Sequence, residues 1–142
     1  MVLLSTDGAV ARDSGHAASR GVVRDREGNW IMGFGRYLGV CSPFEVKAWS
    51  ILDGILLLLN KGFRRVIIQT DSLEVVQALN DLGIKESGVT VLRRAQRTMR
   101  LEGQWRILHI PREHNLVADR LAKLSLNCKS ILQIFDEAPT EI

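Results

Sequence analysis

The chain has 142 residues, of which 46% are hydrophobic and 25% charged, which is typical of a single globular domain with a sizeable core. Its net charge of +3 is compatible with an acidic partner but does not by itself indicate nucleic acid. Two isolated cysteines exclude a disulfide framework and a zinc site, so we expect a reducing intracellular setting, the nucleus or the cytoplasm. No apolar run approaches the ~20 residues that cross a bilayer, and we expect no membrane partner.

The first part of the chain predicts three strands. Residues 2–6, "VLLST", form a short strand that is expected to end at Asp7, before a polar stretch that reaches about residue 19. Residues 21–38 then predict two strands joined by a turn at 26–29.

A helix with a well-marked start follows over residues 43–61. Ser42 is placed to cap it, Pro43 suits its first position, and Glu45 completes a capping box. Lys47 is unexpected, because at about 100° per residue it falls on the apolar face that should be buried.

The second part predicts a strand, two helices, a strand and a last helix, at residues 64–70, 72–80, 88–103, 104–110 and 116–126. This order gives a mixed sheet flanked by helices, within one domain over residues 1–126. Residues 127–142 carry weak signals, and we expect a loose tail there.

Two of the strands finish in an aspartate, "TDG" at Asp7 and "TDS" at Asp71. A crossover helix joins parallel neighbours, so both carboxylates should lie at the same end of the sheet, where ligands of open α/β sheets bind. They would repel each other unless a cation lay between them, and a divalent metal used in phosphate chemistry is a common solution. Each aspartate alone is better explained as a turn residue, but two of them at matching positions favour a metal site. Asp119, early in the last helix, is a third candidate acid.

Five segments in this order resemble a known family: "STDGA", "GVVRDREGNWIMGF", "CSPFEVKAWSILDGI", "VIIQTDSLEVVQAL" and "HIPREHNLVADRLAKL". The chain resembles ribonuclease H type 1 domains, most closely the plant reverse-transcriptase-like ones related to non-LTR retroelements. The resemblance implies a ribonuclease H-like α/β fold with a five-stranded sheet in the order 3-2-1-4-5. It also implies an endonuclease that binds RNA/DNA hybrids and hydrolyses their RNA strand with Mg²⁺ or Mn²⁺, and we expect it to be a monomer.

The resemblance carries over three of the family's four catalytic, metal-binding acids, at Asp7, Asp71 and Asp119. The fourth, a glutamate, maps to Lys47, and Glu45 lies about 200° around the helix from that position. Lys47 either pairs with the aspartates and competes with Mg²⁺, or extends its ammonium to solvent. In both cases one catalytic ligand is missing.

Other positions match the family less specifically. Ser72 and Asn115 match residues near the substrate, although each is also a plain helix cap. His114 resembles a mobile loop histidine of the family, but Glu113 aligns equally well. The segment "RDSG" at residues 12–15 replaces the family's "GNPG" turn, near a loop that contacts the hybrid.

The basic stripe formed by Arg93, Arg97 and Arg100 has two interpretations. It could follow phosphates, or it could be a solvated helix face, and the lack of interleaved aromatic residues favours the solvated face. We expect Trp105, like the other two tryptophans, to belong to the core.

Three functions therefore remain in comparison. The first is a hybrid endonuclease impaired by Lys47, and the second is an inactive nucleic-acid-binding or structural remnant of a retroelement ribonuclease H. An integrase or exonuclease on the same fold fits less well, because the acids follow the order of the hybrid nucleases. Whether the domain works alone or as part of a polyprotein stays open.

Overall fold

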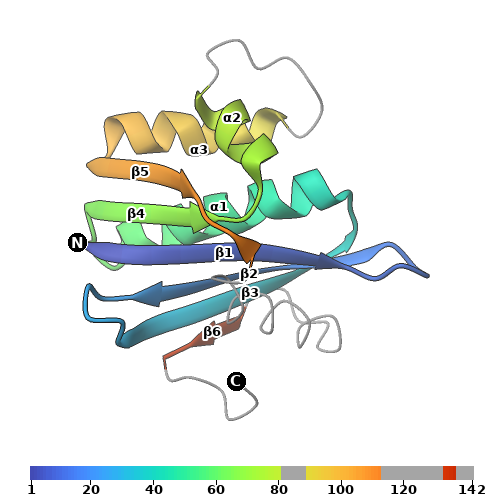
Figure 1. The fold of residues 1–142 in the computed structure, drawn as a ribbon, viewed down its shortest axis with the longest axis horizontal. Coiled ribbons are helices and arrows are strands. Elements are labelled where there is room, and N and C mark those ends of the chain that lie inside the picture. The colour runs from blue at the N-terminus through green and yellow to red at the C-terminus, as the bar shows by residue number, and fades with distance from the viewer. Residues whose placement is uncertain (81–88, 113–132, 137–142) are drawn as a thin grey trace.

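The computed structural model describes residues 1–80, 89–112 and 133–136 (Figure 1). Its elements are β1 (Val2–Val10), β2 (His16–Arg24), β3 (Trp30–Val40), α1 (Pro43–Asn60), β4 (Arg65–Thr70), α2 (Leu73–Asn80), α3 (Val89–Leu101), β5 (Gln104–His109) and β6 (Gln133–Phe135). The expected helix over residues 116–126 lies outside the described residues. No helix in the described part of the chain is long and apolar enough to cross a membrane.

The strands form one mixed sheet in the order β5-β4-β1-β2-β3-β6. β1, β2 and β3 are antiparallel neighbours, whereas β4 runs parallel to both β1 and β5. The predicted order 3-2-1-4-5 is thus confirmed, with β6 added beside β3. β6 comes from the segment expected to be a loose tail, and its pairing covers backbone groups that β3 would otherwise leave open at a sheet edge.

The first two strands are longer than the sequence predicts. β1 does not end at Asp7 but continues to Val10, because β2 offers an antiparallel partner along that whole length. The pairing of β1 with β4 nevertheless stops at Thr6 and Thr70. Asp7 and Asp71 therefore follow the last paired residues of two adjacent parallel strands.

The hydrophobic core lies between the sheet and the three helices. Its largest fully buried apolar side chains come from strands and helices alike: Leu4, Phe34, Ile51, Leu52, Ile55, Leu58, Ile68 and Leu92. α1 approaches the sheet closely at Gly54, where an added Cβ would lie 2.5 Å from Leu4 Cδ2. A larger residue at position 54 would push the helix away from β1.

A partly buried ion pair links β3 to α1. Arg36 Nε donates to Asp53 Oδ2 at 2.8 Å, and its guanidinium lies 6.0 Å from the centre of the Trp49 ring. Burial raises the pKa of Asp53, although Arg36 opposes that shift by hydrogen bonding and by its charge.

Candidate functional site

The start of α1 is held by the capping box that the sequence predicts. The Glu45 backbone N–H donates to Ser42 Oγ at 3.2 Å, and the Ser42 hydroxyl donates to Glu45 Oε1 at 2.9 Å. The other Glu45 oxygen accepts from the Cys41 thiol at 3.9 Å. Burial and the neighbouring carboxylate of Glu45 raise the pKa of Cys41, which keeps the thiol protonated. Glu45 is therefore a capping residue and does not replace the missing glutamate.

α1 meets β1 directly beside Asp7. A Cβ built on Gly8 would lie 2.6 Å from Val46 Cγ1, a separation that real side chains do not tolerate. Only glycine allows this approach, which places the residue after Val46, Lys47, over the end of the β1–β4 pair.

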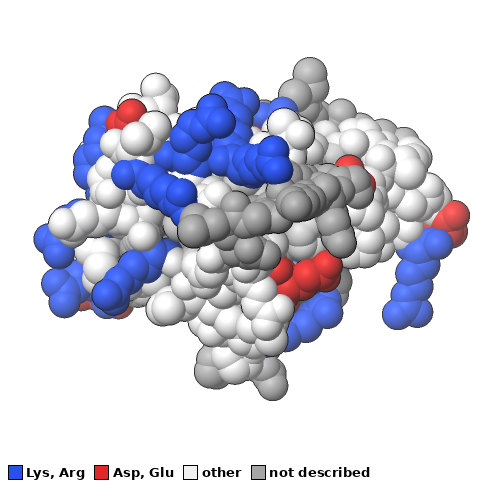
Figure 2. Space-filling model, turned by 90° about the horizontal axis from the view of Figure 1, so that it is seen from above, with Lys and Arg blue, Asp and Glu red and all other residues white. Residues whose placement is uncertain are grey.

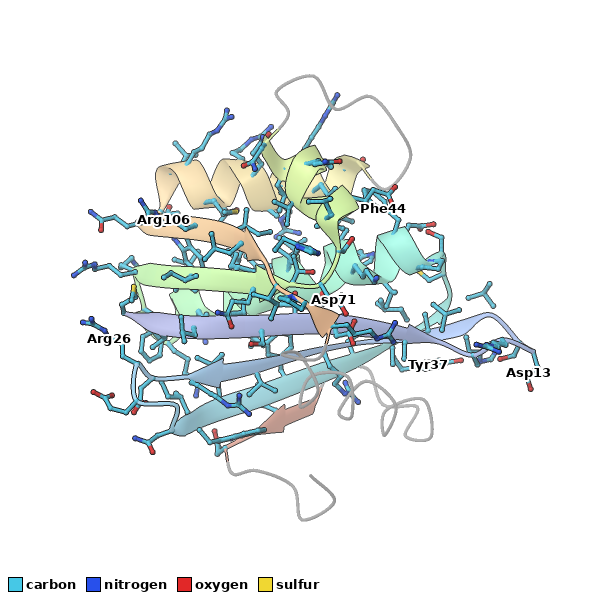
Figure 3. All side chains as sticks on the ribbon, in the orientation of Figure 1. Asp13, Arg26, Tyr37, Phe44, Asp71 and Arg106 are labelled. Atoms are coloured by element: carbon cyan, nitrogen blue, oxygen red, sulfur yellow. The ribbon has the colours of Figure 1, made fainter. Side chains whose placement is uncertain are left out.

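The two aspartates that the sequence singles out are both largely buried. Asp7 is 2% exposed, and the side chain of Asp71 is 7% exposed. Asp71 lies just beyond the carboxyl end of β4, near the middle of the molecule (Figure 3). Adjacent strands are about 4.8 Å apart, so the two backbones bring both carboxylates to one end of the sheet.

Lys47 reaches this end of the sheet from α1. Its ammonium nitrogen lies 3.9 Å from Asp71 Oδ1, and its side chain is 27% exposed. Asp71 Oδ1 is buried and accepts no hydrogen bond from the described residues. Among these residues its ion-pair partner is Lys47. Of the two predicted arrangements, pairing with Asp71 is the one observed, while the exposed part of the side chain still touches solvent.

Arg20 is a neighbour of Asp7 that sequence reasoning missed. The two residues are cross-strand partners of β2 and β1, and Arg20 is only 2% exposed. Its Nη1 donates to the Ser19 carbonyl at 3.0 Å, and its guanidinium occupies the space above Gly35, where a Cβ would lie 1.2 Å from Nη1. The sequence offered no signal for this buried cation, because strand pairing alone brings Arg20 beside Asp7.

Of the four remaining predicted site residues, one lies in the part of the chain that the structure describes and three lie outside it. The Ser72 hydroxyl accepts from the Val75 N–H at 3.3 Å, so Ser72 caps α2, and its role toward a substrate stays a prediction. Asp119, Asn115 and His114 lie outside the described residues.

The resemblance implies a divalent metal at this end of the sheet, and the described side chains do not fit one well. Mg²⁺ requires oxygen ligands in near-octahedral geometry. Here the described oxygens come from Asp7 and Asp71, and the third side chain is the ammonium of Lys47. Within the described residues no three Asp, Glu, His or Cys side chains gather as a metal site requires.

Comparison with known proteins places the chain in a family. The sequence profile described as reverse transcriptase-like matches residues 5–125. The chain belongs to the reverse transcriptase-like family. This domain is also 31% identical over 140 residues to a protein of Arabidopsis thaliana that is named as a ribonuclease H protein. The match covers 97% of this chain but only 22% of that relative.

Solved structures of ribonucleases H share the fold of this reverse transcriptase-like domain. RNase H1 from the archaeon Halobacterium salinarum is 25% identical, with a TM-score of 0.76 over 89% of this chain and 97% of that one. LC11-RNase H1, crystallised with an RNA/DNA hybrid, is 19% identical, with a TM-score of 0.81 over 89% of this chain and 97% of its own. The predicted ribonuclease H-like fold is therefore confirmed.

Proposed function

We propose that this domain binds RNA/DNA hybrids at the end of the sheet that carries Asp7 and Asp71, and that Lys47 suppresses hydrolysis of the RNA strand there. The observation that carries the proposal is the 3.9 Å ion pair between Lys47 Nζ and Asp71 Oδ1. Membership of the reverse transcriptase-like family supports nucleic acid as the ligand class. The hybrid bound by LC11-RNase H1 makes this duplex the first ligand to test.

Charge explains how the site accepts a phosphate backbone. Two buried carboxylates facing a polyanion would repel it, and a family member relies on divalent metal ions to screen that repulsion. In this chain Lys47 neutralises Asp71, and the buried cation of Arg20 lies in register with Asp7. The ion pair of Lys47 therefore lowers the net negative charge at this end of the sheet, and a duplex can approach it with less screening by metal.

The same arrangement reduces catalysis. When bound, divalent metal would activate water and stabilise the leaving oxygen, and it needs carboxylate oxygens at the position that Lys47 occupies. Lys47 offers three N–H donors and no acceptor, so it cannot hold a metal ion. Without a carboxylate at position 47, metal binding at Asp7 and Asp71 is expected to be weak.

A second candidate function is hybrid hydrolysis that is slowed but not lost. One observation favours it: the side chain of Lys47 is 27% exposed. Its ammonium could turn toward solvent and release Asp71 Oδ1, and Asp119 could then supply the third of the family's four acids.

Binding measurements without metal test the proposal. With a chelator present, the unmodified protein is expected to bind a blunt RNA/DNA hybrid, and Lys47→Glu to bind it more weakly, because the change adds two negative charges. Lys47→Arg is the matched control and should bind normally. Failure of the unmodified protein to bind hybrid at low salt would refute the proposal. Equal binding by Lys47→Glu would show that Lys47 does not act by neutralising the site.

A further inference from the structure

A groove lies over β5 and the neighbouring parts of β4, α2 and α3, away from the candidate site. Three adjoining hollows of about 560, 210 and 320 Å³ all share Met99 and Trp105 in their walls. Two of these volumes fall within the ~300–1000 Å³ typical of ligand sites. Among the described strands β5 is the edge of the sheet, so no described strand pairs with its outer edge. Figure 3 places Arg106, in this groove, toward the opposite end of the strands from Asp71.

The charge of the groove is positive throughout. Arg65, Arg100 and Arg106 line it, and its described lining contains no Asp or Glu. Residues 89–112, which form α3 and β5, contain six arginines and one glutamate, a formal charge of +5 in a chain whose total is +3. Lys and Arg side chains accordingly gather over this side of the molecule (Figure 2).

An aromatic ring lies among these arginines. Trp105 shares the walls of one hollow with Arg100 and those of the two others with Arg106. Its indole N–H donates to the Glu102 carbonyl at 2.7 Å, which fixes the ring, and the side chain is only partly buried against the core. The basic stripe on α3 contains no aromatic residue of its own, which from sequence favoured a solvated face. The fold supplies an aromatic partner from β5.

We infer that this groove binds single-stranded nucleic acid, with the arginines contacting phosphates and Trp105 stacking on an unpaired base. The inference rests on the proposed function for its ligand class and assigns a second contact outside the Asp7–Asp71 end. Positively charged grooves with accessible aromatic rings are the common form of single-strand sites. A duplex, whose bases are already stacked, would gain nothing from Trp105. An acidic peptide pairing with the edge of β5 is the competing occupant, and it leaves no role for the tryptophan ring.

The test measures fluorescence anisotropy of a labelled single strand of ~12 nucleotides, within the range of known single-strand sites. Arg100→Gln with Arg106→Gln should weaken binding and lower the salt slope by about 1.4, because each single-strand phosphate contact contributes about 0.7. Both arginines are exposed, so this pair tests the groove without risk to the fold. Trp105→Leu should weaken binding by about fivefold or more, and Trp105→Phe should restore most of it.

Arg26→Gln, in the exposed turn between β2 and β3, is the control for loss of a positive charge outside the groove and should leave affinity and salt slope unchanged. Binding of a blunt hybrid, measured in parallel, separates this inference from the proposed function. Binding of hybrid but not of single strand would overturn the inference and leave the proposed function standing. Binding of single strand that depends on the groove residues, without binding of hybrid, would overturn the proposed function and leave this inference standing. An unchanged salt slope in the double arginine variant, or a poly-glutamate peptide that binds with the same dependence on Trp105, would also overturn the inference.

Discussion

Replacement of Lys47 by glutamate should restore metal-dependent cleavage. The expected gain in cleavage rate has two parts. The first part is removal of a cation. Unit charges about 4 Å apart interact by about 4 kcal/mol at an effective dielectric constant of 20, so a divalent ion at Asp71 would face about twice that repulsion. Lys47 can avoid most of it by moving into solvent, which it already touches. The cost of metal entry is then the loss of one partly exposed ion pair, about 1 kcal/mol or roughly fivefold in affinity.

The second part is recovery of a ligand. A metal ion stabilises the charge of a phosphoryl transition state by several kcal/mol, and each ~1.4 kcal/mol is tenfold in rate. Lys47→Met, which removes only the charge, should therefore improve metal affinity by about fivefold. Lys47→Glu should exceed Lys47→Met in cleavage rate by about a hundredfold or more.

The assay follows release of a fluorophore from the RNA strand of a hybrid under single-turnover conditions, while Mg²⁺ or Mn²⁺ is titrated. Lys47→Glu combined with Asp71→Asn should lose the gain, which excludes a contaminating nuclease as its source. Circular dichroism checks that each variant is folded. Equal cleavage rates for the unmodified protein and Lys47→Glu would show that Lys47 does not suppress hydrolysis. If Lys47→Met equals Lys47→Glu, the cation rather than the missing ligand limits catalysis.

Three further predictions concern stability, each measured by urea unfolding. Gly8→Ala should cost about 1–3 kcal/mol, because its methyl group would overlap Val46, and Val46→Ala should recover part of that loss in the double variant. Ser42→Ala should cost about 1 kcal/mol through loss of the α1 cap, whereas Ser42→Asp should cost little. Burial raises the pKa of Asp53 above its ordinary 3.8, so its carboxyl group binds a proton more tightly in the folded state. Its contribution to stability is therefore present below that ordinary value and is lost as pH rises through the folded pKa. As the pH rises through that range, the free energy of unfolding of the unmodified protein should fall relative to that of Asp53→Asn. A relative rise would contradict the raised pKa of Asp53.

The elements of this fold could largely be predicted from the sequence, because local patterns determine them. The cap at Ser42 is such a pattern, and so is the alternation of strands with a crossover helix that sets the order of β1 and β4. The C-terminal end of β1 was not predictable in this way. Asp7 and Gly8 suggest a turn, yet the strand continues to Val10 because β2 pairs with it and α1 packs against Gly8.

The candidate side chains could be named from the sequence: two aspartates that follow matching strands, and a lysine where the family has a glutamate. The sequence left open whether Lys47 would pair with an acid or extend into solvent. The position of Lys47 became known from the packing of α1 on the sheet, because its ion pair with Asp71 depends on how closely the helix approaches β1. The same reason applies to Arg20 beside Asp7 and to Trp105 beside Arg100. Strand pairing brings Arg20 beside Asp7, and the packing of α3 against β5 brings Arg100 and Trp105 to the walls of one hollow.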